Sequence, residues 1–264
     1  MFEYVLSQCW DNYKNTECCH GKDYSCNCYN CLNIGFYSHS DEYNCEKEML
    51  FYVLNYGASY ISEFYHYLSE SRILDDFNGN LNVLSLGCGF CPDYYALSKF
   101  IADKNLGIQL SHFGIDNSAF WNKARLNHPN ISYQQSDLTD LTNPLSFKGY
   151  NLITINKVFS SLYGHNNHIS FLQNIGNAIR TSMNNNTVLI FNDVNSIHMG
   201  RDIFDQSISR YFNNIRRYYT DSPPYIGNGW IPIPQTNVIY PINTYENITP
   251  LTTVTKTVFF EYRN

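Results

Sequence analysis

Residues that could bind a nucleoside follow three successive expected strands in the middle of the chain. The β-type run at 81–86 leads into a Gly-Cys-Gly turn at 87–89, and a helix is expected from residue 93 to residue 101. Such a unit presents backbone N–H groups and the positive end of a helix dipole to a ligand. Asp116 ends the next strand, where a carboxylate can accept both hydroxyls of a ribose. Asp137 follows the third strand, where it can accept from an adenine amino group.

Each of these features also has a purely structural interpretation. A Gly-x-Gly turn alone is as often a simple turn as a binding loop, and an aspartate after a strand is often a turn residue or a helix cap. Three features in register on successive strands nevertheless favour a nucleoside site, because ligands of open α/β sheets bind outside the carboxyl ends of the strands.

Short buried strands alternate with helices over most of the chain, which predicts an α/β fold with a parallel sheet. The first helix, 46–74, could break near Gly57, and two strands are expected to close the chain after a loop rich in Pro and Gly at 221–234. The expected strands are 81–86, 111–115, 131–134, 151–155, 187–191, 237–242 and 252–262, and the later helices are 93–101, 118–126, 168–183 and 200–219.

Four segments between residues 75 and 195 carry a resemblance to a known family. The run LNVLSLGCGFCPDYYALSKFI at 81–101 resembles the first motif of class I S-adenosylmethionine-dependent methyltransferases. FGID at 113–116 resembles their second-strand acidic signature, and QQSDLTDL at 134–141 resembles their third motif. The segment YNLITINKVFSSLY at 150–163 resembles the fourth motif of members that act on small molecules or proteins.

The resemblance implies a Rossmann-like, seven-stranded, mostly parallel sheet with an antiparallel last strand, flanked by helices. It also implies S-adenosylmethionine as the cofactor. Two departures from the family pattern stand out: Cys91 replaces the third glycine of the first motif, and the fourth motif lacks the Asn-Pro-Pro-Tyr type of sequence found in enzymes that methylate adenine amino groups. The residues that the resemblance places at the cofactor are Gly87, Cys88, Gly89, Asp116, Asn117, Asp137, Leu138 and Asn156.

In a methyl transfer the cofactor supplies the electrophile, so the protein mainly aligns the acceptor and takes up its proton. The candidate catalytic residues lie just beyond the fourth and fifth strands and are Asn156, His165 and Asp193. His165, or the nearby His168, could be a general base because imidazole titrates near neutral pH. A loop histidine is also often simply solvated, and Asp193 could instead orient an acceptor or lie beside a helix cap.

The N-terminal residues 1–45 form a Cys-rich segment that we separate from a methyltransferase-like domain at 46–264. Cys28-x-x-Cys31 can supply two thiolates on one turn, and a second pair from nearby would complete a tetrahedral zinc site. The segment has little apolar content of its own, so a structural Zn²⁺ would be a source of its stability. The candidate ligands are Cys18, Cys19, Cys26, Cys28 and Cys31, with His20, His39 or Cys45 in reserve.

Composition limits the partners of this chain. Its 264 residues carry a net charge of −6, and residues 1–50 hold three Lys against eight Asp or Glu. This acidic balance speaks against nucleic acid, since affinity for phosphate depends on cationic contacts. The one basic patch expected lies on the 200–219 helix. No apolar run approaches the ~20 residues of a membrane span.

The start of the chain has no basic, apolar signal region, so a cytoplasmic protein is expected. Nine Cys in such a chain favour metal ligation over disulfides. The leading hypothesis is a methyltransferase for a small-molecule or protein acceptor. The alternatives are an RNA methyltransferase, and a non-catalytic interaction protein that retains the fold.

Overall fold

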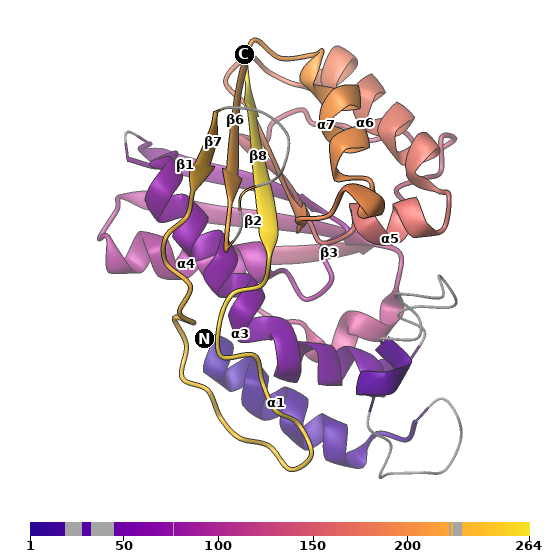
Figure 1. Ribbon diagram of the computed structural model, residues 1–264, viewed down its shortest axis with the longest axis vertical. Helices are drawn as coiled ribbons and strands as arrows, with labels where there is room; N and C mark the ends of the chain where they lie inside the picture. The colour runs from indigo at the N-terminus through magenta and orange to yellow at the C-terminus, as the bar shows by residue number, and fades with distance from the viewer. Residues whose placement is uncertain (19–27, 33–44, 76, 222, 224–228) are drawn as a thin grey trace.

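The computed structural model describes residues 1–18, 28–32, 45–75, 77–221, 223 and 229–264 (Figure 1). Its helices are α1 Phe2–Asn15, α3 Glu46–Ser71, α4 Pro92–Asp103, α5 Phe159–Gly164, α6 His168–Ser182 and α7 Arg201–Ser209, with short 3₁₀ helices η1 Ala119–Ala124 and η2 Ile197–Met199. Its strands are β1 Gly79–Leu86, β2 Ile108–Asp116, β3 Ile131–Gln135, β4 Leu152–Asn156, β5 Val188–Val194, β6 Asn214–Tyr219, β7 Trp230–Pro232 and β8 Thr257–Arg263.

The strands form one sheet in the order β3-β2-β1-β4-β5-β8-β6-β7. Strands β3, β2, β1, β4 and β5 are parallel, whereas β8 runs antiparallel between β5 and β6. The predicted Rossmann-like α/β class and the antiparallel last strand are confirmed. The sheet has eight strands rather than the expected seven, because β6 and β7 are strands that were not expected and residues 237–242 do not form the strand that was.

The chain reverses direction across the sheet between β1 and β4. From β1 the chain builds outward through β2 to β3, and it then returns to place β4 and β5 on the other side of β1. At such a switch point the loops after neighbouring strands separate and leave a crevice outside their carboxyl ends. This topology brings the residues that follow β1, β2 and β4 to a common edge.

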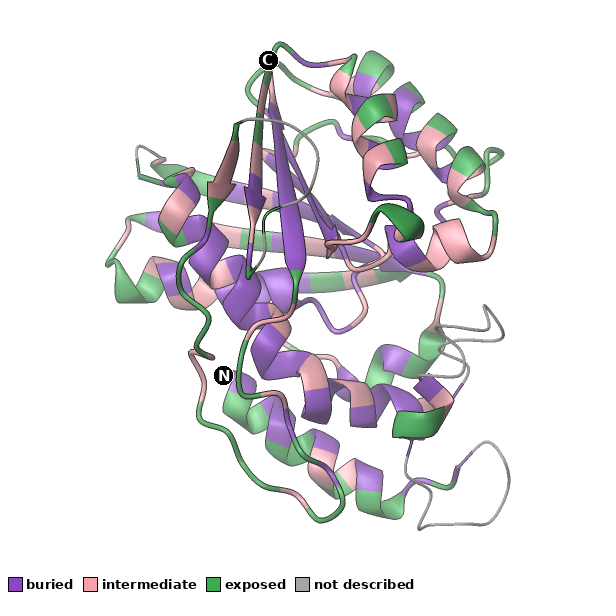
Figure 2. Cartoon of the chain, viewed as in Figure 1, coloured by how far each residue is buried: buried purple, intermediate pink, exposed green. Residues whose placement is uncertain are grey.

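The sheet is covered on both faces, as Figures 1 and 2 show. One core packs α1, α3 and α4 against the sheet, and the other packs α5, α6 and α7 against the opposite face. The alternation is visible within β8, where Phe259 belongs to the first core and Phe260 to the second. Successive side chains of a strand point to opposite faces, so both faces of the central strands are apolar.

Helix α1 was not expected from the sequence, and it packs into the main core. The Phe2 ring lies 5.1 Å from the Tyr95 ring and 6.3 Å from the Phe90 ring, measured between centroids. Helix α3 also runs unbroken through Gly57, where a Cβ atom would lie only 2.8 Å from Cζ of Phe2. Gly57 therefore makes room for Phe2 and does not interrupt the helix.

Residues 200–219 do not form the single helix that their apolar spacing predicts. Helix α7 ends at Ser209, and the whole of β6 pairs with β8 in an antiparallel ladder. Backbone pairing outweighs the helical spacing of the apolar side chains. Arg210, Arg216 and Arg217 therefore do not share one helix face.

Three further segments differ from the expectation. Residues 237–242 form only one isolated bridge, Asn237 with Thr253, and the last strand begins at Thr257 rather than at residue 252. The segment after β2 is a 3₁₀ helix and not an α-helix. None of the helices that the structure describes combines the length and the apolar character of a membrane-spanning helix.

The packing of α1 gives a direct test of its contribution to stability. Phe2→Ala should lower the free energy of unfolding by about 3–5 kcal/mol, because it leaves a cavity among aromatic rings. Tyr4→Ala on the exposed side of the same helix, where Tyr4 is 61% exposed, should change it by less than about 0.5 kcal/mol. Urea denaturation followed by circular dichroism measures both. Equal effects of the two substitutions would show that α1 does not belong to the cooperative core.

Candidate functional site

A cavity of about 490 Å³ opens at the carboxyl ends of β1, β2 and β4. All eight residues predicted to contact the cofactor line it, and so does His165, which was predicted as a catalytic residue. Lys157 and a group of aromatic side chains, which the sequence interpretation did not single out, complete its wall. The lining residues used below are Tyr52, Tyr60, Gly87, Cys88, Gly89, Asp116, Asn117, Phe120, Trp121, Asp137, Leu138, Asn156, Lys157 and His165.

The Gly-Cys-Gly turn after β1 forms the floor of this cavity. Gly87 has a φ of +64° and Gly89 a φ of +51°, in the left-handed region that favours glycine. A Cβ atom on Gly87 would lie 2.5 Å from Cγ2 of Val158, so no larger residue fits at this position. The turn is fixed to the neighbouring strand because Cys88 N donates to the Ile115 carbonyl at 3.0 Å.

Asp116 joins the end of β2 to this turn. Its Oδ2 accepts from Gly89 N and its Oδ1 from Ser118 N, each at 2.9 Å. Burial raises the pKa of Asp116 above the ordinary value of an aspartate, although the two backbone hydrogen bonds and the charge of Arg125 act in the opposite direction. Each carboxylate oxygen can accept more than one hydrogen bond, so the group can hold the turn and still accept from ligand hydroxyls.

Asp137 and Leu138 follow β3 and offer a polar and an apolar contact side by side. Oδ1 of Asp137 accepts from the backbone N and the hydroxyl of Thr139, at 2.8 and 2.7 Å. No donor among the described residues reaches its Oδ2. Asp137 is exposed, whereas Leu138 is buried beneath it. The pair can accept from an amino group and pack against a flat ring.

Asn156 ends β4 and is the most informative residue of the cavity. Only 7% of it is exposed, and neither its Oδ1 nor its Nδ2 makes a hydrogen bond within the part of the chain that the structure describes. A buried polar group without a partner costs about 1–3 kcal/mol. Asn156 lines the cavity, so a ligand with both donor and acceptor groups there would remove this cost.

The next residue, Lys157, also lines the cavity, and its ammonium group has partners on α3 and β8. Nζ lies 2.9 Å from Oε2 of Glu63 and donates to the hydroxyl of Thr257 at 2.8 Å. Nζ also lies 5.0 Å from the centre of the Tyr60 ring. The only sequence signal for Lys157 is a lysine directly after a buried strand. Its partner could not be predicted, because Glu63 lies on a distant helix.

Aromatic side chains form a further part of the cavity wall, and one of them, Trp121, lies directly beside Gly89 of the glycine turn. Tyr52 and Tyr60 come from α3, and Phe120 and Trp121 come from η1. The Tyr52 and Trp121 rings meet edge to face at 5.5 Å, and Tyr56 stacks on Tyr60 at 5.6 Å. The sequence signal for this wall was a row of tyrosines at four-residue spacing on α3. The sequence interpretation predicted the helix but gave it no role at the site.

His165 and Asp193, the two remaining catalytic candidates, lie in different surroundings. His165 lines the cavity, and its Nδ1 lies 2.8 Å from the Ser161 carbonyl oxygen. The neutral ring therefore holds its proton on Nδ1, which makes Nε2 the acceptor. His168 belongs to a separate cavity between α6 and α7.

Asp193 does not line the cavity. Its Oδ2 accepts from Ser160 N at 2.9 Å, next to the start of α5, and its Oδ1 accepts from Val194 N at 2.7 Å. Burial raises the pKa of Asp193, and Lys157 counteracts this effect. The side chain therefore positions α5 beside β5 and does not itself line the cavity.

The predicted zinc ligands lie only partly within the described residues. Cys19 and Cys26 fall outside them, whereas Cys18 and Cys28 are buried and Cys31 is half-buried. The N-terminal zinc site therefore stays a prediction.

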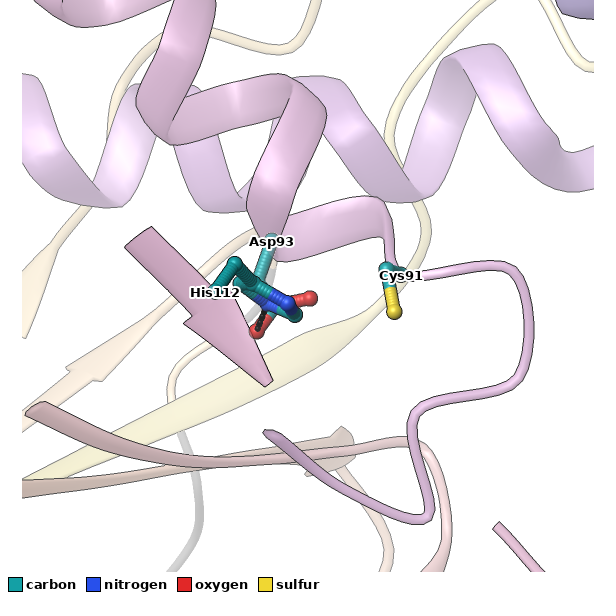
Figure 3. Close-up of side chains that lie close together, drawn as sticks. All are labelled: Cys91, Asp93 and His112. Carbon is teal, nitrogen blue, oxygen red and sulfur yellow. Dashed lines mark hydrogen bonds and ion pairs between the residues drawn. The ribbon is translucent and has the colours of Figure 1, made fainter. Parts of the chain in front are cut away.

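A different group that could hold a metal ion, formed by Cys91, Asp93 and His112, lies beneath the glycine turn (Figure 3). Nε2 of His112 lies 3.1 Å from Oδ2 of Asp93, which also accepts from the Thr154 hydroxyl. Burial alone would raise the pKa of Asp93, but the interactions with His112 and Thr154 lower it below its ordinary value. Hydrogen bonds of Asp93 with His112 and Thr154 account for these contacts without a metal.

No family model matches the chain, and no curated protein matches it in sequence. Among solved structures, the chain is similar to the N-methyltransferase NodS from Bradyrhizobium japonicum, in complex with S-adenosyl-L-homocysteine. That alignment has 11% identity, covers 90% of this chain and 99% of that chain, and has a TM-score of 0.47. A TehB-like S-adenosylmethionine-dependent methyltransferase from Corynebacterium glutamicum aligns at 13% identity, over 78% of this chain and 97% of that chain, with a TM-score of 0.44. Both TM-scores are below 0.5. We therefore assign the fold from the strand order of this chain and not from these similarities.

The raised pKa of Asp116 predicts a pH-dependent stability difference. Between the ordinary aspartate pKa of about 3.9 and the higher folded value, the folded chain binds more protons than the unfolded chain. The contribution of Asp116 to the free energy of unfolding is therefore complete below the ordinary value and decreases as pH rises through the folded value. Asp116→Asn lacks this titration.

The parent chain should accordingly lose stability relative to Asp116→Asn as pH rises from about 4 through the higher folded pKa of Asp116. Urea denaturation of both proteins at several pH values measures the difference, in which the titrations of all other groups cancel. A difference that stays constant or increases with pH would show that burial does not control this carboxyl group.

Proposed function

We propose that this protein is an S-adenosylmethionine-dependent methyltransferase that acts on a small-molecule or protein acceptor. The observation that carries the proposal is the buried, unpartnered amide of Asn156, which shares one cavity with the glycine turn and the two strand-end carboxylates. Three separate strands supply these groups, and the switch point between β1 and β4 is where open α/β sheets bind ligands.

The residues present fit an adenosyl cofactor. Gly87 and Gly89 allow a ligand to approach the backbone closely, Asp116 can accept from two ribose hydroxyls, and Asp137 can accept from an adenine amino group. Leu138 and Asn117 lie next to these carboxylates, and the amide of Asn156 can donate and accept toward a polar group. When bound, the cofactor would supply an electrophilic methyl group.

The charges around the cavity favour a neutral or cationic acceptor. Lys157 is the only Lys or Arg among its described lining residues, and Glu63 neutralises it. Asp116 and Asp137 leave the cavity with negative charge. The aromatic wall can hold an apolar body or attract a cation through its ring faces. An RNA acceptor, the first alternative, would bring phosphates to a cavity that offers them no unpaired cation.

In this proposal His165 accepts the acceptor's proton at Nε2, because the Ser161 carbonyl oxygen holds the proton on Nδ1. Asn156 orients the reacting groups. Asp193 is a positioning residue, since it holds Ser160 at the start of the helix that ends beside His165. The second alternative, a non-catalytic interaction protein with this fold, would not require a cavity that binds an adenosyl ligand.

A matched pair of variants tests the cofactor site. Asp137 and Asp140 make the same turn, each accepting from the backbone N and hydroxyl of the threonine two residues later, but only Asp137 lines the cavity. Asp137→Asn should weaken the binding of S-adenosylhomocysteine by about 10- to 100-fold, as expected for one hydrogen bond to a charged group. Asp140→Asn should leave the affinity unchanged. Isothermal titration calorimetry measures both.

No binding to the parent chain would refute both enzyme interpretations and leave the interaction protein. Equal losses in the two variants would mean that the turn, and not the carboxylate in the cavity, controls affinity. Once binding is established, transfer of a labelled methyl group from S-adenosylmethionine to small-molecule, protein and RNA fractions of an extract would identify the acceptor class.

We also propose one structural Zn²⁺ in the Cys-rich segment, on the spacing of Cys28 and Cys31 and the burial of Cys18 and Cys28. Protein purified without chelator should contain about one zinc per chain by mass spectrometry of the metal. The double substitution Cys28→Ser with Cys31→Ser should remove it, and His112→Gln should not. The opposite pattern would place the metal at the cluster of Cys91, Asp93 and His112, and zinc-free parent protein would exclude both sites.

A further inference from the structure

Cys88 lies within the glycine turn and Cys91 follows it, at the spacing of a Cys-x-x-Cys motif. Cys88 and Cys91 lie between β1 and α4, and the Cys91 backbone N donates to the Cys88 carbonyl oxygen at 2.6 Å. This bond closes a tight turn and brings the two residues together. Both cysteines are reduced and buried in the structure.

The two sulfur atoms meet above Gly114 of β2. A Cβ atom built on Gly114 would lie 2.7 Å from Sγ of Cys88 and 3.1 Å from Sγ of Cys91. Both thiols therefore occupy the space that any larger residue at position 114 would fill. Burial raises the pKa of Cys91, and a hydrogen bond with the Cys88 side chain raises it further. The thiols are thus neighbours, as a disulfide would require.

The backbone at Cys91 gives an independent reason to expect a role for its side chain. Cys91 has a φ of +63°, in a region where a side chain causes strain and glycine does not. The sequence pattern of this turn also predicts glycine at this position. Strained conformations of this kind persist where the surrounding structure holds them, and they concentrate at functional sites.

The surroundings of the two thiols differ in a way that assigns them different roles. Cys88 lines the cavity, and Nη2 of Arg125 lies 3.6 Å from its sulfur. Arg125 is fixed by a 2.8 Å hydrogen bond from its Nε to the Gly89 carbonyl and by contact with the Tyr133 ring. The thiolate is the reactive form of a cysteine, and the Arg125 guanidinium group would lie beside one formed at Cys88. Cys91 is fully buried behind it and does not line the cavity.

We propose that Cys88 and Cys91 are a reversible thiol–disulfide pair, oxidised by small hydroperoxides that enter through the cavity. The Cys88 thiolate attacks the peroxide, the O–O bond breaks, and Cys88 becomes a sulfenic acid while the peroxide leaves as an alcohol or water after taking up a proton. The Cys91 sulfur then attacks the Cys88 sulfur, and the hydroxyl group leaves as water with the Cys91 proton. Two thiols are oxidised and one peroxide is reduced.

Oxidation of this pair would act on the same turn that holds Asp116. Gly89, whose N–H donates to that carboxylate, lies between the two cysteines. A disulfide would remove the Cys88 thiol from its contact with Arg125 and fix the turn covalently. The pair is therefore a modification site built into the floor of the cavity.

The experiment uses the full chain without any adenosyl compound, so its result does not depend on the proposed function. Reduced protein is treated with hydrogen peroxide, quenched at acid pH with N-ethylmaleimide and digested with trypsin. The tryptic peptide 73–99 contains Cys88 and Cys91 and no other cysteine, and peptide 1–14 contains only Cys9. Mass spectrometry should show peptide 73–99 without label and lighter by two hydrogens, and dithiothreitol should restore both labels.

Cys9 is the internal control, because burial raises its pKa to about 12 and it does not line the cavity. Its peptide should keep its label throughout. In Cys91→Ser, Cys88 should accumulate as a sulfenic acid that dimedone traps, whereas in Cys88→Ser, Cys91 should remain a thiol. Full labelling of peptide 73–99 after peroxide treatment of the parent chain, or linkage of Cys88 to a cysteine of another peptide, would overturn the proposal.

Discussion

The carboxylate of Asp116 joins the two elements on which the cavity depends. It accepts from Gly89 N in the turn after β1 and from Ser118 N in the segment after β2, so one side chain connects two neighbouring loops. The parallel register of β1 with β2 and β4 brings those loops to the same edge, where Leu86 pairs with both Ile115 and Ile155. Without this connection the glycine turn would be held by the Cys88 backbone and by the hydrogen bond from Arg125 to the Gly89 carbonyl. The position of every other lining group is set relative to these strand ends.

Local sequence pattern was sufficient to predict that these strand-end residues lie together in one cavity. Gly87, Asp116, Asp137 and Asn156 each follow a strand, and parallel strands deliver their carboxyl ends to one edge without further information. The order of strands and helices follows from the same alternation. The pattern could not place the side chain of Asp193, which lies near the end of β5. Whether its carboxylate faces the cavity or the start of α5 depends on how that helix packs against β5, and the sequence does not specify this packing.

The wrong predictions for other segments share a physical cause. Residues 214–219 have apolar spacing that suits a helix, but β8 offers a complete antiparallel ladder, and its hydrogen bonds decide the outcome. Helix α1 lies in a segment whose cysteines suggested a metal-dependent fold, yet Phe2 inserts against Gly57 and joins the main core. In each case a contact between distant segments outweighs local preference, and such contacts are the part of a fold that composition and periodicity describe least well.

The charge of the cavity near Lys157 is also set by a contact between distant segments. Lys157 follows Asn156 directly and has a left-handed backbone conformation, with a φ of +56°. Its ammonium group pairs with Glu63 of α3, whose Oε1 also accepts from the backbone N and the hydroxyl of Thr255. A buried lysine without this partner would give the cavity a positive centre suited to phosphates. With it, the negative charge of Asp116 and Asp137 is left uncompensated by Lys157. The packing of α3 against the end of β4 therefore contributes to the charge of the cavity, although neither Glu63 nor Thr255 lines it.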